Sequence, residues 1–111
     1  MLVEMEDACV AVQASAFMRV EDVDYQKGSA ANNRNVYFAV TGRGPGAGTY
    51  NDWGTVYKLE LDANNPLEGQ LTQIVSGNTN TNNADGNLSE LQSPDNICVT
   101  ENFVYFQEDP N

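Results

Sequence analysis

A pair of strands with the same composition occurs twice in this chain, and this repeat limits the folds the chain can adopt. In the first copy an acidic opening, Glu21-Asp22-Val23, is followed after a turn by Val36-Tyr37-Phe38. In the second copy Asp95-Asn96-Ile97 is followed by Val104-Tyr105-Phe106. Segments 55–61 and 70–75 lie between the copies and also read as strands, so the period is four strands. Four sequential antiparallel strands are the unit of a β-propeller blade, although a plain antiparallel sandwich could give a similar pattern.

The expected fold is therefore all-β, a β-propeller fragment consisting of one four-stranded antiparallel blade plus half of the next, with a short N-terminal helix. The chain has 111 residues, which is too few for a closed propeller of four or more blades. An alanine-rich stretch over 7–18 without Gly or Pro predicts the helix. The predicted divisions are a leading helix at 1–18, a first blade at 19–76, a variable loop at 77–92 and the start of the next blade at 93–111.

The charge balance bears on the class of partner. Sixteen acidic residues against five basic ones give a net charge of −11 at pH 7. This charge repels nucleic acid and anionic membranes and suits hard cations, although an acid surplus also simply keeps a surface solvated. The chain has no histidine, which excludes histidine-based metal sites, Ser-His-Asp triads and a histidine general base within it.

Sequence signals for membrane insertion and export are missing in the given residues. No apolar run is long enough to span a bilayer, so no membrane span is expected. The stretch Met1–Asp7 is acidic where a signal peptide is basic, so either the protein is not exported or Met1 is not its natural start. Cys9 and Cys98, the two cysteines, permit no disulfide framework to be inferred, and both are expected to be buried small hydrophobes.

Acidic residues at the ends of the predicted strands are the candidate site. Glu21, Asp95 and Glu108 lie at strand ends, where carboxylates held by a sheet can converge on one cation beyond its edge. Asn96 adds an amide oxygen, a hard donor of the kind calcium prefers. Adjacent strand residues face opposite ways, so at most one of the pair Glu21 and Asp22 is expected to reach a given ion. The alternatives are solvated strand ends and, at Pro94-Asp95-Asn96, an ordinary turn.

Two polar loops are further candidates for a binding site. Gly42 to Gly54 holds five glycines, but it has no Lys-Ser/Thr and no following helix, so a connecting loop is expected instead of a phosphate-binding one. The Asn- and Thr-rich tract at 76–87 does not match an EF-hand loop, because Thr81 and Gln92 stand where carboxylates are required. It is expected to be a variable loop between blades.

Five segments, in order, resemble the PhoX-type alkaline phosphatases. The resemblance covers nearly all of the chain and is weakest over 76–92. The segments are Phe17-Met18-Arg19-Val20-Glu21-Asp22, Val36–Gly42, Trp53–Leu59, Pro94–Val99 and Gln107-Glu108-Asp109-Pro110.

This resemblance implies a large exported β-propeller, periplasmic or secreted, whose iron and calcium ions hydrolyse phosphate monoesters. It implies metal-ligand roles for Glu21 and Glu108, and a place at the metal site for Asp95 and Asn96. Family members are several times longer, and their iron-binding cysteine lies in a Cys-Glu-Glu segment upstream of anything present here. The chain alone is therefore expected to be inactive, with a phosphate ester as the substrate of the intact parent.

Two other functions remain open at this point. One is a non-catalytic calcium-binding propeller or adhesion module, and the other is a lactonase-like propeller enzyme that also uses calcium. The isolated 111 residues are expected to be marginally stable or to self-associate, because an open blade leaves unpaired strand edges.

Overall fold

The computed structural model describes residues 2–42, 53–77 and 91–109. All six strands predicted from the sequence are present, together with one α-helix and one short 3₁₀ helix. The elements are α1 (Leu2–Ala11), β1 (Val20–Tyr25), η1 (Asn32–Arg34), β2 (Asn35–Val40), β3 (Thr55–Leu61), β4 (Gly69–Ser76), β5 (Pro94–Val99) and β6 (Val104–Glu108).

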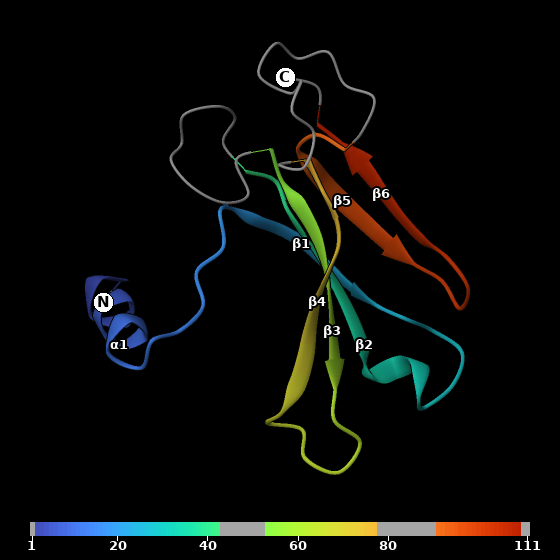
Figure 1. Cartoon of the computed structure of the whole chain (residues 1–111), viewed down its shortest axis with the longest axis horizontal. Coiled ribbons are helices and arrows are strands. Elements are labelled where there is room, and N and C mark those ends of the chain that lie inside the picture. Colours follow the sequence, from blue (N-terminus) through green and yellow to red (C-terminus); the bar gives the residue numbers. More distant parts are fainter. Residues whose placement is uncertain (1, 43–52, 78–90, 110–111) are drawn as a thin grey trace.

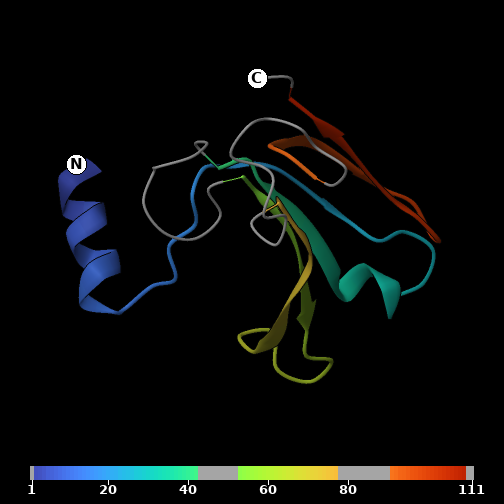
Figure 2. The same ribbon diagram turned by 45° about the horizontal axis from the view of Figure 1, so that its top comes forward.

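The strands form two antiparallel sheets. The first has the order β1-β2-β3-β4, each strand pairing with the next in sequence, and the second consists of β5 and β6. The β5–β6 sheet lies against β1 and β2, as Figures 1 and 2 show from two directions. The prediction of an all-β fold with a short N-terminal helix is confirmed.

A small apolar core fills the space between the two sheets. Tyr37 and Val56 from the first sheet meet Ile97 and Val99 from the second. Leu91, which falls within the predicted variable loop, is also part of this core and is 4% exposed. Residues 78–90 of that predicted loop and most of the glycine-rich loop, 43–52, lie outside the described residues.

The helix ends earlier than predicted, at Ala11. Gln13 has a left-handed φ of 55°, its N–H donates to the Val10 carbonyl, and the Ala14 N–H donates to the Cys9 carbonyl. These are the two bonds of a Schellman motif, which ends a helix even where alanine continues. The helix stands apart from both sheets (Figures 1 and 2), so tertiary packing does not set its boundaries.

The predicted burial of the two cysteines is wrong, because both are free and exposed. Cys9 lies on α1, whose side chains from residue 4 onward are exposed. Cys98 stands between Ile97 and Val99 in β5. Because successive strand residues point to opposite faces, the burial of those two neighbours turns Cys98 outward.

The two copies of the sequence repeat have the same strand register. In each copy the valine or isoleucine of the first strand stands opposite the phenylalanine of the second, and the next residue stands opposite the tyrosine. The equivalent pairs are Val23–Phe38 and Ile97–Phe106, Asp24–Tyr37 and Cys98–Tyr105, and Tyr25–Val36 and Val99–Val104.

The irregular features of the two copies also coincide. A β-bulge interrupts the pairing at Glu21 in β1 and at Asp95 in β5. Two residues before each bulge stands a non-glycine residue with positive φ, Arg19 at 65° and Ser93 at 47°. Such residues are uncommon, so their occurrence at one equivalent point is a second sign that the copies are structural repeats.

The turns that close the two hairpins differ in length. In the first copy the Gln26 N–H donates to the Asn35 carbonyl, and the intervening residues include η1. In the second copy the Thr100 N–H donates to the Phe103 carbonyl across a much shorter turn. The hydrogen bond that closes the turn occupies the same place in both hairpins, so the extra residues of the first turn do not disturb its strands.

Candidate functional site

The four residues predicted to hold metal ions lie at one end of the two sheets. Glu21 is near the start of β1, and Asp95 and Asn96 are near the start of β5. Glu108 ends β6 and stands opposite Pro94, the first residue of β5. β1 and β5 run parallel, since side chains of residues 22 and 24 contact the backbone of residues 97 and 99, so both strands begin at the same end.

Two of the three carboxylates among these residues, Glu21 and Glu108, have polar partners. Glu21 Oε1 lies 3.0 Å from Arg19 Nη2 in an ion pair, and both side chains are partly exposed. Glu108 Oε1 accepts a 2.6 Å hydrogen bond from the Gln92 N–H, which ties the end of β6 to the segment entering β5. Asp95 is half-buried and Asn96 is exposed.

Glu21 and Asp95 occupy the same position in the two repeats, the β-bulge. A bulged residue is left out of the ladder, and bulges often redirect a side chain at a functional edge. Within residues 2–42, 53–77 and 91–109, however, no three Asp, Glu or Cys side chains gather into a group that could hold a metal ion. The four predicted residues share an end of the fold, but the described part of the chain does not complete a metal site.

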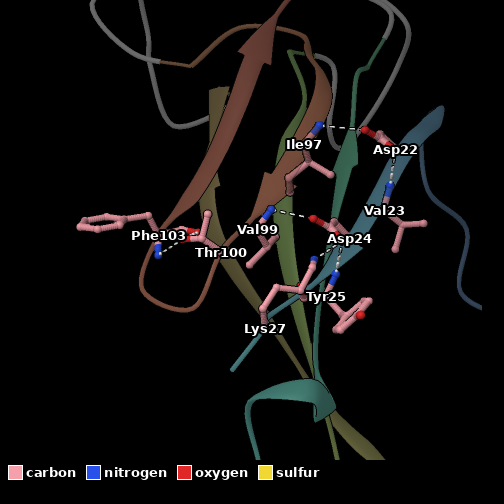
Figure 3. A network of polar contacts seen from close by, with 9 residues as sticks. All are labelled: Asp22, Val23, Asp24, Tyr25, Lys27, Ile97, Val99, Thr100 and Phe103. Carbon is pink, nitrogen blue, oxygen red and sulfur yellow. Dashed lines mark hydrogen bonds and ion pairs between the residues drawn. The ribbon is translucent and has the colours of Figure 1, made fainter. Parts of the chain in front are cut away.

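Asp22 and Asp24 have a role that the sequence reasoning missed. Figure 3 shows both side chains reaching from β1 toward β5. Asp22 accepts the Val23 N–H on Oδ1 and the Ile97 N–H on Oδ2, each at 2.9 Å. Asp24 repeats this arrangement one pleat later.

Asp24 accepts three hydrogen bonds, two of which are shorter than the 2.9 Å bonds to Asp22. Its Oδ2 accepts the Val99 N–H at 2.7 Å, and its Oδ1 accepts the Tyr25 N–H at 2.9 Å. Lys27 Nζ also donates to Oδ1, at 2.6 Å. β1 and β5 belong to different sheets, so these two carboxylates take the place of a backbone ladder between them. We call this pair of residues the aspartate bridge.

The aspartate bridge had a recognisable sequence signal. Asp22 and Asp24 are two residues apart in a strand, so both face the same side of the sheet. Two acids on one face can each accept an N–H from a neighbouring strand edge. The sequence-based prediction treats Glu21 and Asp22 as an adjacent pair and gives Asp24 no role.

Hydrogen bonding lowers the pKa of Asp24. Burial raises the pKa and is the largest single influence, but hydrogen bonds from Lys27 Nζ and from the Val99 and Tyr25 N–H groups together outweigh it. The pKa of Asp24 therefore lies below its ordinary value of 3.8. The carboxylate form is favoured because it accepts all of these donors.

This shift gives a pH-dependent stability. A carboxyl whose pKa is lower in the folded state stabilises the fold above pH 3.8, and that contribution is lost as pH falls through the folded-state pKa. Below about pH 4 we expect the free energy of unfolding to fall more steeply with decreasing pH in the wild type than in Asp24→Asn. The difference between the two slopes corresponds to the uptake of up to about one additional proton per molecule on unfolding of the wild type, because only the wild type has this carboxyl to protonate. Urea titrations of both proteins between about pH 6 and pH 3 measure the difference. Parallel pH profiles would contradict it.

A further hollow lies at the other end of the first sheet. It has a volume of about 400 Å³ and surrounds the β3–β4 turn, with Arg34, Glu60, Asp62 and Glu68 on its walls. The Asp62 carboxylate already accepts the N–H groups of Asn64 and Asn65. This hollow is remote from the strand ends that carry the predicted ligands, so it is not part of the candidate site.

No helix in the described residues is long and apolar enough to cross a bilayer. The chain matches no protein-family model, no curated protein and no solved structure.

Proposed function

We propose that this chain forms one and a half blades of a β-propeller in a metal-dependent phosphatase of the PhoX type, and that Glu21, Asp95, Asn96 and Glu108 contribute to its metal centre. One observation carries the proposal. Glu21 and Asp95 are the bulged residues of two equivalent strands that start at the same end of the fold. Successive repeats therefore present an acidic side chain at corresponding places, as a shared ion site requires.

The strand order supports the propeller part of the proposal. β1 to β4 pair in sequence, and β5 then starts a second sheet beside β1 and parallel to it. In a propeller the blades are four-stranded sheets arranged around a central channel, and neighbouring blades pack face to face. The contact of β5 with β1 and β2 is the arrangement expected of two such blades.

The donor chemistry of the four residues fits calcium. Three carboxylates and one amide oxygen are hard ligands, and calcium takes six to eight of these. Further ligands would have to come from residues beyond the described ones. A bound cation would supply neutralisation of phosphate oxygens and activation of an oxygen nucleophile.

The residues of this chain would orient and balance such a site. Arg19 holds one oxygen of Glu21, and the Gln92 N–H holds one oxygen of Glu108, which fixes the direction of both carboxylates. The net charge of −11 would repel a phosphate ester. An acidic protein that binds such a substrate therefore needs cations between its carboxylates and the phosphate.

Substitution of the two glutamates tests the proposal. In the intact protein that contains these residues, Glu21→Gln and Glu108→Gln are each expected to lower phosphatase turnover at least about tenfold, because an amide is a weaker, neutral metal ligand. Hydrolysis of p-nitrophenyl phosphate with calcium and iron supplied, together with the metal content of each variant, gives the measurement. Glu60→Gln, at the far end of β3, is the matched control and should behave as wild type. Near-normal turnover in either site variant would remove that residue from the metal centre.

An oxygen-only donor set is also what a non-catalytic calcium module would use. The same experiment separates this second candidate. An intact protein that binds calcium and loses it in the two glutamate variants, yet hydrolyses neither a phosphate ester nor a lactone, is such a module.

A further inference from the structure

Each sheet has two faces, and equivalent residues of the two repeats identify the corresponding face in each sheet. We call the side bearing Tyr37 or Tyr105 the tyrosine face, and the side bearing Phe38 or Phe106 the phenylalanine face. Residues paired across an antiparallel ladder share a face, so Val23 joins Phe38, and Ile97 joins Phe106.

Inside the chain, unlike faces pack together. The tyrosine face of the first sheet, with Tyr37 and Val56, is buried against the phenylalanine face of the second, with Ile97 and Val99. Leu91 fills the space between them. This contact is the interior of the molecule.

The other two faces are covered only in part by the described residues. On the phenylalanine face of the first sheet, Val23 is 59% exposed and Tyr25 is 47% exposed. On the tyrosine face of the second sheet, Tyr105 is 57% exposed and Cys98 is also exposed. Tyr105 is the counterpart of Tyr37, which is only 9% exposed. The difference arises because the tyrosine face of the first sheet has a partner sheet, whereas no described residues cover that of the second.

Phe17 indicates that the free phenylalanine face is already shaped for such a contact. It stands two residues before the positive-φ residue Arg19, as Leu91 stands two residues before Ser93. Its ring packs edge-on against two rings of this face, with centroid-to-centroid distances of 5.2 Å to Phe38 and 5.3 Å to Tyr57. Phe17 thus occupies on the free face the place that Leu91 occupies in the core.

We propose that two copies of this chain associate head to tail, with the tyrosine face of the β5–β6 sheet of one copy packed on the phenylalanine face of the β1–β4 sheet of the other. The two free faces are the repeat equivalents of the two faces already packed together within each chain. The contact between copies therefore reproduces the contact within a copy, with Tyr105 in the role of Tyr37, and with Val23 and Phe17 in the roles of Ile97 and Leu91. The inference does not rest on the phosphatase proposal.

This mode of association is heterologous, since it joins two different surfaces. After one contact forms, each end of the pair still carries one free face, so longer assemblies can grow. Within the described ranges the second sheet has two strands where the first has four, so it offers no counterpart of Val56, and the contact is smaller than the internal one. We therefore expect association in the micromolar range.

Sedimentation velocity of the 111-residue chain from about 1 to 500 µM tests the proposal, with EDTA and a reductant present to prevent bridging by metals or by the exposed cysteines. The wild-type mean mass is expected to rise with concentration. Tyr105→Asp disrupts the tyrosine face of the second sheet, and Val23→Asp disrupts the phenylalanine face of the first sheet. Each substitution places an unpaired charge in the contact. Each variant alone should require at least about tenfold higher concentration to associate.

An equimolar mixture of Tyr105→Asp and Val23→Asp gives the decisive result. Each variant keeps the face that the other has lost, so the mixture should form a dimer of limited size. Leu67→Asp, whose parent side chain is 93% exposed in the β3–β4 turn, is the control and should associate as wild type does. Circular dichroism establishes that each variant is folded, and Tyr25→Asp replaces Val23→Asp if the latter is not.

Three outcomes would overturn the proposal. A wild-type chain that stays monomeric over the whole range excludes it. So does a mixture of the two variants that remains monomeric. Variants that associate as strongly as wild type would place the contact elsewhere, for example at the strand edges.

Discussion

Replacing both residues of the aspartate bridge, with Asp22→Asn and Asp24→Asn in one chain, is expected to lower the free energy of unfolding by about 3 kcal/mol. Each aspartate uses one oxygen for an N–H of β1 and the other for an N–H of β5. Asparagine has a single carbonyl oxygen, so one N–H per residue loses its acceptor and faces an NH₂ group instead. Because the bridge stands where a backbone ladder would otherwise join the strands, this loss acts directly between the two sheets.

Urea denaturation followed by circular dichroism measures this change, and Asp62→Asn is the matched control. Asp62 also accepts two backbone N–H groups, but both bond to Oδ1 and both belong to the same turn. The asparagine oxygen can keep both bonds, so we expect a much smaller change in the free energy of unfolding than in the double variant. If the double variant and the control unfold at the same urea concentration, the bridge does not hold the sheets together.

Gly54→Ala is expected to cost at least about 3 kcal/mol, a large share of the stability of a domain this small. Gly54 has a φ of 88°, which an L-residue rarely adopts. An added Cβ would lie 2.7 Å from the Val40 carbonyl oxygen and 2.8 Å from the Thr41 carbonyl oxygen, and it would also strike the Pro94 ring. These are backbone and ring atoms where β2 ends and β5 begins, so they cannot rotate away.

Gly28→Ala separates the clash at Gly54 from the cost of the backbone angle. Gly28 also has a positive φ, 106°, but the three atoms nearest to a Cβ there all belong to the flexible side chain of Glu101. We expect a loss of about 1 kcal/mol for this variant, from the backbone angle alone. The unfolding free energies of both variants in urea give the comparison, and equal losses would mean that the crowding at Gly54 has no energetic effect.

The strands could be predicted from the sequence because their signals are local. Val36-Tyr37-Phe38 and Val104-Tyr105-Phe106 combine β-branched and aromatic residues, and the glycine and asparagine turns mark their limits. The end of the helix was predicted too far along the chain. It depends on the left-handed conformation of Gln13, and glutamine gives no sign of that conformation in a sequence. The predicted burial of Cys98 is wrong because it follows from the apolar composition of the segment. The side of the sheet on which a strand residue lies depends instead on its place in the strand alternation.

The site was less predictable, because it depends on relations between the two copies. The sequence indicates acids at strand ends, but not that Glu21 and Asp95 are bulged at equivalent positions, since a bulge depends on pairing with the neighbouring strand. The aspartate bridge depends on β5 lying beside β1, a contact between residues far apart in the chain. The metal-ligand roles of Glu21, Asp95, Asn96 and Glu108 remain predictions.

The unequal turns of the two hairpins have a consequence for how the repeat can diverge and be engineered. One turn holds η1 and the other is only a few residues long, yet the flanking strands keep one register. Lengthening a loop costs little free energy, so this end of a duplicated unit can accumulate insertions, whereas the bulged end constrains both copies alike. Residues 28–34 are therefore the place to graft a foreign epitope or an affinity tag, and the turn of the second copy is a natural template for a shortened version of the first.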